Sequence, residues 1–180
     1  MWWGIGIDFH GMLRASTRAD HDQVDALFGA FDLAEASSYG TMLRAHARAL
    51  LPVEAWMADG AVPLWEPRGA ALRADLDALG LTVPDVPPLH WRTDDAALWG
   101  TAYVLEGSRL GGAMIARRLP SAMPRAYLGQ VHAPGHWRAF LAALDERAEV
   151  NGAQWQADAV AAAQRTFETF AAAARSERSR

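Results

Sequence analysis

Apolar residues recur every three or four positions along most of the chain, which is the spacing that gathers side chains on one face of an α-helix. The first such period starts at Leu13 and predicts a helix that ends near Gly29 or Phe31. The face that this spacing defines carries Arg14, Thr17, His21, Val24 and Phe28. This helix therefore places a histidine in its middle, among apolar neighbours.

Five more helices are predicted from the same spacing, with proline- and glycine-containing segments between them. Their predicted ranges are 32–59, 70–79, 94–119, 135–148 and 153–174. An irregular arm (residues 1–11) is expected before the helical domain (12–175), and a polar tail (176–180) after it. The prediction is a single all-α domain, a multi-helical bundle of about six helices.

The predicted helix over residues 94–119 carries three glycines in its interior, Gly107, Gly111 and Gly112. Each costs about 1 kcal/mol relative to alanine, so the three together cost about 3 kcal/mol. A helix face without side chains suits a second helix that crosses at close range, or a flat ligand that lies against the backbone. The glycine spacing taken alone favours the helix crossing.

The composition removes several classes of chemistry. The chain has no cysteine, which excludes disulfides, thiolate metal sites and cysteine nucleophiles. All 17 basic residues are arginine, which excludes a Schiff base and a P-loop lysine. A net charge of −4 without a basic block argues against nucleic acid as a partner. No run is apolar enough to span a membrane, and no signal peptide is evident, so a cytoplasmic location is expected.

His21 is the most informative histidine, because Asp25 lies four residues later on the same helix. A metal-ligating histidine commonly donates its second N–H to such an acceptor. The alternative is a structural histidine with an incidental neighbour. His132 and His136 are also four apart, but Pro134 and Gly135 between them break a helix, so a metal pair is not expected there.

The remaining histidines are predicted to lie in loops or at the surface: His10, His46 and His90. The chain contains no His-Glu-x-x-His motif, no Walker sequence and no GxGxxG sequence. An orientable histidine on one helix and bare glycines on another would suit a planar, apolar ligand with a metal centre, and haem meets that description. Arg14 and Arg138 are candidates to meet its two propionates.

Three stretches resemble the haem oxygenase family. They are Leu13-Arg14-x-x-Thr17-x-x-x-His21-x-x-Val24-Asp25, Tyr103-Val-Leu-Glu-Gly107-Ser108-x-Leu-Gly111-Gly112 and Trp137-Arg138-x-Phe140-Leu141-x-x-Leu144. They are similar to the family's proximal helix, its distal helix and the segment whose arginine meets a propionate. The distal stretch has the form found among bacterial members that accompany bacteriophytochromes.

The resemblance implies a haem oxygenase-like bundle that opens haem to biliverdin, CO and ferrous iron, with O2 and an external electron donor. It implies His21 as the axial ligand of the iron. The residues implied to contact haem are Arg14, Thr17, Asp25, Tyr103 and Arg138. The residues implied on the catalytic, distal side are Gly107, Ser108, Gly111 and Gly112. Implied partners are a redox protein of the ferredoxin or reductase type and a bacteriophytochrome that accepts the bilin.

One position departs from the pattern of many family members. They carry an aspartate after the first distal glycine, where it organises the water that feeds protons to the reaction. Here that residue is Ser108, and Arg109 or main-chain carbonyls could help to hold the water. The alternatives to the enzyme are a haem or bilin carrier that keeps the fold without the reaction, and a structural helical module.

Overall fold

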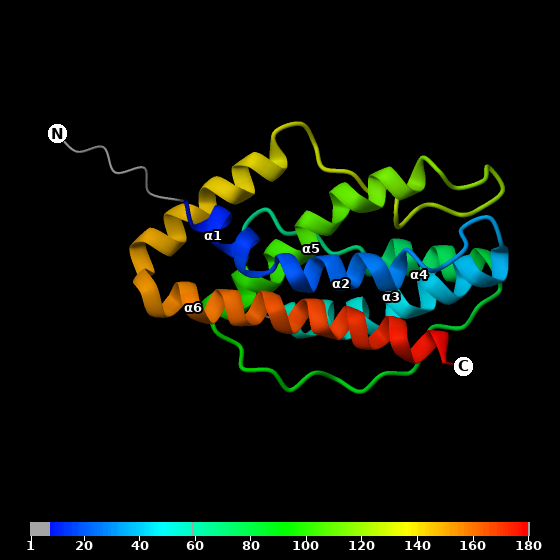
Figure 1. Cartoon of the computed structure of the whole chain (residues 1–180), viewed down its shortest axis with the longest axis horizontal. Helices are drawn as coiled ribbons and strands as arrows, with labels where there is room; N and C mark the ends of the chain where they lie inside the picture. Colours follow the sequence, from blue (N-terminus) through cyan, green and yellow to red (C-terminus); the bar gives the residue numbers. More distant parts are fainter. Residues whose placement is uncertain (1–7, 59, 180) are drawn as a thin grey trace.

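Residues 8–58 and 60–179 are described by the computed structural model, and they form six helices and no strand (Figure 1). The helices are α1 (Phe9–Ser16), α2 (Arg18–Phe28), α3 (Ala36–Met57), α4 (Gly69–Ala78), α5 (Asp95–Ala116) and α6 (His136–Arg178). The longest of them, α6, packs against α1, α2, α3 and α5. The predicted all-α bundle is confirmed, and α6 is its scaffold.

The first predicted helix is interrupted at Thr17. This residue has φ −104° and ψ 5°, and it separates α1 from α2. Its side chain is buried, and its hydroxyl donates to the carbonyl of Leu13 at 2.9 Å. A threonine that bonds back to the preceding turn bends a helix. The single helix expected from Leu13 onwards is therefore two helices that meet at Thr17.

Helical structure also begins earlier than expected. The Asp8 carboxylate accepts a hydrogen bond from the backbone N–H of Gly11 at 3.0 Å, which caps α1 and lets the helix begin at Phe9. Residues 9–11, expected in the irregular arm, are thus helical. The rest of the expected arm, residues 1–7, lies outside the described part of the chain.

Local signals located the middle helices well, with one exception. The Asp94 carboxylate accepts from the N–H of Ala97 at 2.9 Å and caps the start of α5. Gly80, with φ 68°, follows the end of α4. The exception is the helix predicted from residue 32, because Asp32 does not cap α3. Its carboxylate instead accepts from the N–H of Ala34 at 2.9 Å in a turn, and the helix begins at Ala36.

The two helices predicted near the C-terminus are the two arms of α6, which changes direction at Gly152 (Figure 1). The backbone angles of Gly152 are φ 77° and ψ −171°, a conformation that favours glycine. The arm before Gly152 carries the Trp137 stretch, and the arm after it covers α3 and α2.

The end of α6 is ordered by an ion pair. Glu177, with a side chain only 3% exposed, lies 3.1 Å from Arg44 Nε and 2.6 Å from Arg48 Nη2, both on α3. The helix therefore continues to Arg178, into the stretch expected as a polar tail (176–180). No pattern in the sequence indicated these ion pairs, because the two arginines lie about 130 positions before Glu177.

The closest helix crossing lies at Gly100, where α5 meets the second arm of α6. A β-carbon placed on Gly100 would lie 2.1 Å from the carbonyl oxygen of Ala159, so only glycine fits. A close helix crossing thus exists, but about two to three turns before the distal glycines. None of the helices formed by the described residues is long and apolar enough to cross a membrane.

Candidate functional site

His21 lies on α2 with 58% of its side chain exposed, so it is not a core histidine. Its Nδ1 atom is 3.4 Å from the Asp25 carboxylate, as the four-residue spacing predicts. The edge of the ring meets Phe167 of α6, with 5.8 Å between ring centroids and an angle of 69°. The imidazole is therefore oriented on one side by Asp25 and Phe167, while much of its surface stays accessible to a ligand.

The three distal glycines lie inside α5 but face different surroundings. A β-carbon at Gly107 would lie 3.5 Å from the Trp137 ring, and one at Gly112 would lie 3.5 Å from the carbonyl oxygen of Leu128. A β-carbon at Gly111 would have no described atom within 4 Å. Packing thus explains Gly107 and Gly112, whereas Gly111 is exposed and a side chain there would meet no described atom.

Arg14 of α1 lies close enough to Tyr103 of α5 for its charge to act on the phenol. Burial raises the pKa of the Tyr103 phenol, and the positive charge of the Arg14 guanidinium partly opposes that rise. The Tyr103 ring also packs on Trp137, with 5.8 Å between centroids. Arg138, near the start of α6, is exposed and has no polar partner within the described part of the chain.

His46 is not the surface or loop residue that the sequence suggested. It lies on α3, half-buried, with its ring 4.3 Å from that of Phe28 at the end of α2. Its Nδ1 atom is 3.1 Å from the hydroxyl of Tyr127. Burial, with a smaller contribution from the nearby charge of Arg68, lowers the pKa of His46 to about 3, so the ring is neutral near pH 7.

Arg68 connects this aromatic group to the distal helix. The guanidinium is buried and lies 5.0 Å from the centre of the Tyr127 ring. It donates to Ser108 Oγ at 2.6 Å and to the carbonyl of Leu105 at 3.1 Å. His46, Tyr127, Arg68 and Ser108 therefore form a continuous path from α3 to the residue after Gly107.

Ser108 and Arg109 have different surroundings. The Ser108 hydroxyl donates to the carbonyl of Leu105 at 2.7 Å and accepts from Arg68, which leaves one lone pair on its oxygen. Arg109 is buried, donates to the Glu106 carboxylate at 3.0 Å and also bonds to the carbonyl of Glu66. Arg109 is thus held by these partners, and its part in ordering distal water stays a prediction.

No spacing in the sequence pointed to His46, Tyr127 or Arg68. Arg68 lies 40 positions before Ser108, and His46 lies 81 positions before Tyr127. A signal that could have found Arg68 is its place directly after Pro67 at the start of a helix, yet that position indicates a helix boundary and not a partner. Such contacts are created only when α3, α4 and α5 pack together.

The chain is similar to one haem oxygenase in sequence and to another in fold. No protein-family model matches the chain. A haem oxygenase of Xanthomonas campestris pv. campestris (strain 8004) is 39% identical over 153 residues, which cover 76% of this chain and 88% of that protein.

The fold is similar to that of a haem oxygenase from Neisseria meningitidis solved with NO and CO bound. The TM-score is 0.78 at 24% identity, over 96% of this chain and 92% of that one, and this likeness shows a shared fold. The sequence likeness to the Xanthomonas protein extends over most of both chains, and with the shared fold it leads to one conclusion: this chain belongs to the haem oxygenase family.

Proposed function

We propose that this protein is a haem oxygenase, which opens haem oxidatively to biliverdin, CO and ferrous iron with O2 and electrons from an external donor. The observation that carries the proposal is the 39% identity to the Xanthomonas haem oxygenase over most of both chains. Haem is the substrate, and when bound it supplies the iron at which O2 is activated. The protein's part is to hold the ring, exclude bulk water and place protons.

His21 is proposed as the axial ligand of the iron. An axial imidazole bonds through one nitrogen and is oriented by a hydrogen bond at the other. Asp25, 3.4 Å from Nδ1, is placed to supply that second interaction, which leaves Nε2 for the iron. Thr17 contributes indirectly, since the bend that it makes between α1 and α2 sets the direction in which α2 presents the imidazole.

The distal side of the ring is proposed to lie on α5 at Gly111. The backbone of α5 is uncovered there, because a β-carbon at Gly111 would meet no described atom within 4 Å, and any side chain would project into the space proposed for the ring. Gly107 and Gly112 let Trp137 and Leu128 approach α5 on either side of that surface. Arg14, Tyr103 and Arg138 are proposed to meet the propionates, because carboxylates need cationic or hydroxyl partners at a pocket rim.

Ser108 is proposed to hold an ordered water in place of the aspartate of other members. Its free lone pair can accept a hydrogen bond from water, while Arg68 and the Leu105 carbonyl fix the hydroxyl. The neutral imidazole of His46 positions Tyr127, and the Tyr127 ring lies against Arg68. These residues would thus keep the water network in place without a carboxylate.

The electrons are proposed to come from a redox protein of the ferredoxin or reductase type, as the resemblance to the haem oxygenase family implies. A bacteriophytochrome is proposed as the acceptor of the bilin, on the sequence resemblance to members that accompany such photoreceptors. Co-purification with either partner would be a first measure of these two proposals.

The test is an aerobic turnover assay on the full-length chain loaded with one equivalent of haem. Adding an electron donor should bleach the Soret band, and chromatography should identify biliverdin as the product, with CO released in equal amount. Haem in buffer with the same donor is the control for uncatalysed breakdown. A Soret band that persists, with no bilin formed, would instead identify a haem carrier.

A further inference from the structure

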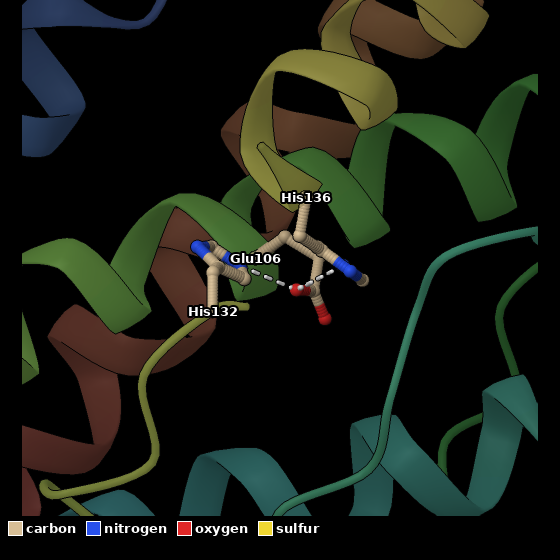
Figure 2. A group of neighbouring side chains, drawn as sticks. All are labelled: Glu106, His132 and His136. Atoms are coloured by element: carbon tan, nitrogen blue, oxygen red, sulfur yellow. Dashed lines mark hydrogen bonds and ion pairs between the residues drawn. The ribbon is translucent and has the colours of Figure 1, made fainter. Parts of the chain in front are cut away.

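A second group of metal-ligating side chains lies next to the proposed haem site. Three side chains point towards one another there: Glu106 of α5, His132 of the loop between α5 and α6, and His136 at the start of α6 (Figure 2). The Glu106 Oε2 atom is 2.8 Å from His132 Nε2 and 3.7 Å from His136 Nε2. Three potential ligand atoms, two nitrogens and one oxygen, thus lie within 4.8 Å of one another.

The sequence argued against this pair of histidines because Pro134 and Gly135 separate them. The structure nevertheless brings the two rings together without a helix. Gly135 adopts φ 84°, and the chain turns there so that the two imidazole rings stack with 4.9 Å between centroids and 14° between planes. Both rings then present Nε2 to the same carboxylate, which the i, i+4 rule for helices does not anticipate.

The distances suit a divalent transition metal. Zinc bonds to histidine nitrogen and to carboxylate oxygen at about 2.0–2.2 Å, so ligand atoms around a tetrahedral ion lie about 3.4 Å apart. The observed separations of 2.8 and 3.7 Å lie on either side of that value. A pair of imidazoles with one carboxylate is a donor set typical of zinc and of ferrous iron with open positions.

The burial and hydrogen bonding of these side chains also fit a metal-binding site rather than a cluster of surface residues. The side chains of Glu106, His132 and His136 are 1%, 8% and 14% exposed. Arg109 donates to both oxygens of Glu106, at 3.0 and 3.3 Å, and would act as the outer partner that orients a ligating carboxylate. The carbonyl of Leu64 lies 2.7 Å from His136 Nε2 and would be exchanged for the ion.

The backbone conformation of Leu64 is unusual for a residue with a side chain. Its φ of 65° is the one positive value found for a residue other than glycine in the described chain. Strained backbone of this kind occurs at functional sites, where the surrounding structure holds it. The strain here directs a carbonyl at His136.

We propose that Glu106, His132 and His136 form a binding site for a divalent first-row transition metal ion, separate from the iron of haem. The Trp137 ring links the two sites. It stacks on His132 with 5.9 Å between centroids, and its other contacts include Gly107 and Tyr103. The site does not depend on the proposed reaction, because all three ligands belong to the haem-free fold.

The experiment is a titration of the full-length chain with Co²⁺, whose visible absorption reports coordination by nitrogen and oxygen, and with Zn²⁺ by calorimetry. Each titration is carried out with and without one equivalent of haem. One equivalent of metal should bind in both states. His132→Gln and His136→Gln should each weaken binding by at least about 100-fold, since even outer partners are worth about 10- to 100-fold.

His10→Gln is the matched control, because Asp8, His10 and Asp145 form the other group that could attract a metal. This variant should bind like the unmodified chain. Absence of saturable binding, unchanged binding in both of the first two variants, or loss of binding in His10→Gln would each overturn the proposal. His136→Gln retains a donor for the Leu64 carbonyl, so its urea midpoint without metal should confirm an intact fold.

Discussion

Replacing Gly111 by alanine should stabilise the haem-free protein and weaken its complex with haem. Alanine is favoured over glycine in a helix interior by about 1 kcal/mol, and the new methyl group would have no described atom within 4 Å. With a urea dependence of about 2 kcal/mol per molar, the unfolding midpoint should rise by about 0.5 M. The same methyl group would project into the space proposed for haem.

The loss of haem affinity follows from the cost of one extra methyl group in a packed interface. Overpacking costs about 1–3 kcal/mol, which corresponds to a roughly 5- to 150-fold increase in Kd. The assay is a haem titration followed at the Soret band, beside urea unfolding of the haem-free chain. We expect the unfolding midpoint to rise while the affinity for haem falls, because glycine at this position favours contact with the ligand and not the stability of the helix.

Gly100→Ala is the matched control on the same helix. Its β-carbon would lie 2.1 Å from the carbonyl oxygen of Ala159, so α5 and α6 would have to separate. We expect net destabilisation of at least about 1 kcal/mol despite the better helix propensity of alanine. If Gly111→Ala is stabilised and binds haem unchanged, Gly111 does not contact haem. If Gly111→Ala is destabilised, the space beside it is not free.

Three further predictions concern single side chains. His21→Ala should leave the free energy of unfolding of the haem-free chain unchanged within about 0.5 kcal/mol, because the side chain is exposed, but should change the coordination spectrum of bound haem; an unchanged spectrum would mean that another residue ligates the iron. The pKa of His46 is about 3 in the folded chain and 6.5 in the unfolded chain. Below about pH 6 the unfolded chain therefore binds a proton at His46 that the folded chain does not bind. The free energy of unfolding should fall by roughly 1 kcal/mol for each pH unit in that range. His46→Gln should lose that part of the pH dependence, and identical pH profiles for the two chains would contradict the assignment. Glu177→Ala should cost about 2 kcal/mol in urea unfolding, since it removes charged hydrogen bonds to Arg44 and Arg48 without touching the haem site; no change in stability would show that the end of α6 is held by apolar packing alone.

Much of the fold could be predicted because the signals are local. Helix formation depends on residues within a turn or two of one another, so apolar periodicity, the Asp94 cap and the glycine near the end of α4 were sufficient. The spacing of His21 and Asp25 was readable for the same reason, since one helical turn brings them together. The break at Thr17 is local too, but apolar periodicity does not reveal it, because it depends on the hydrogen bond from the Thr17 hydroxyl to the carbonyl of Leu13.

Other features depend on packing between distant segments. The contact of Arg68 with Ser108, the burial of His46 beside Tyr127 and the ion pairs of Glu177 join residues 40 to 133 positions apart. Sequence spacing carries no information about such pairs without an alignment. The same holds for Gly100, which no pattern separated from the other glycines of α5.

The sequence by itself therefore determined the helices, the histidine with its aspartate, and the presence of a side-chain-poor face on α5, because each arises from bonds and spacings within one helix. Only the tertiary structure decided that Gly111 faces free space whereas Gly107 and Gly112 are covered, and that Glu106 meets two histidines from another segment. The physical reason is that burial and free volume belong to the packed bundle, where α5, α6 and the loop between them contribute atoms to the same few ångströms.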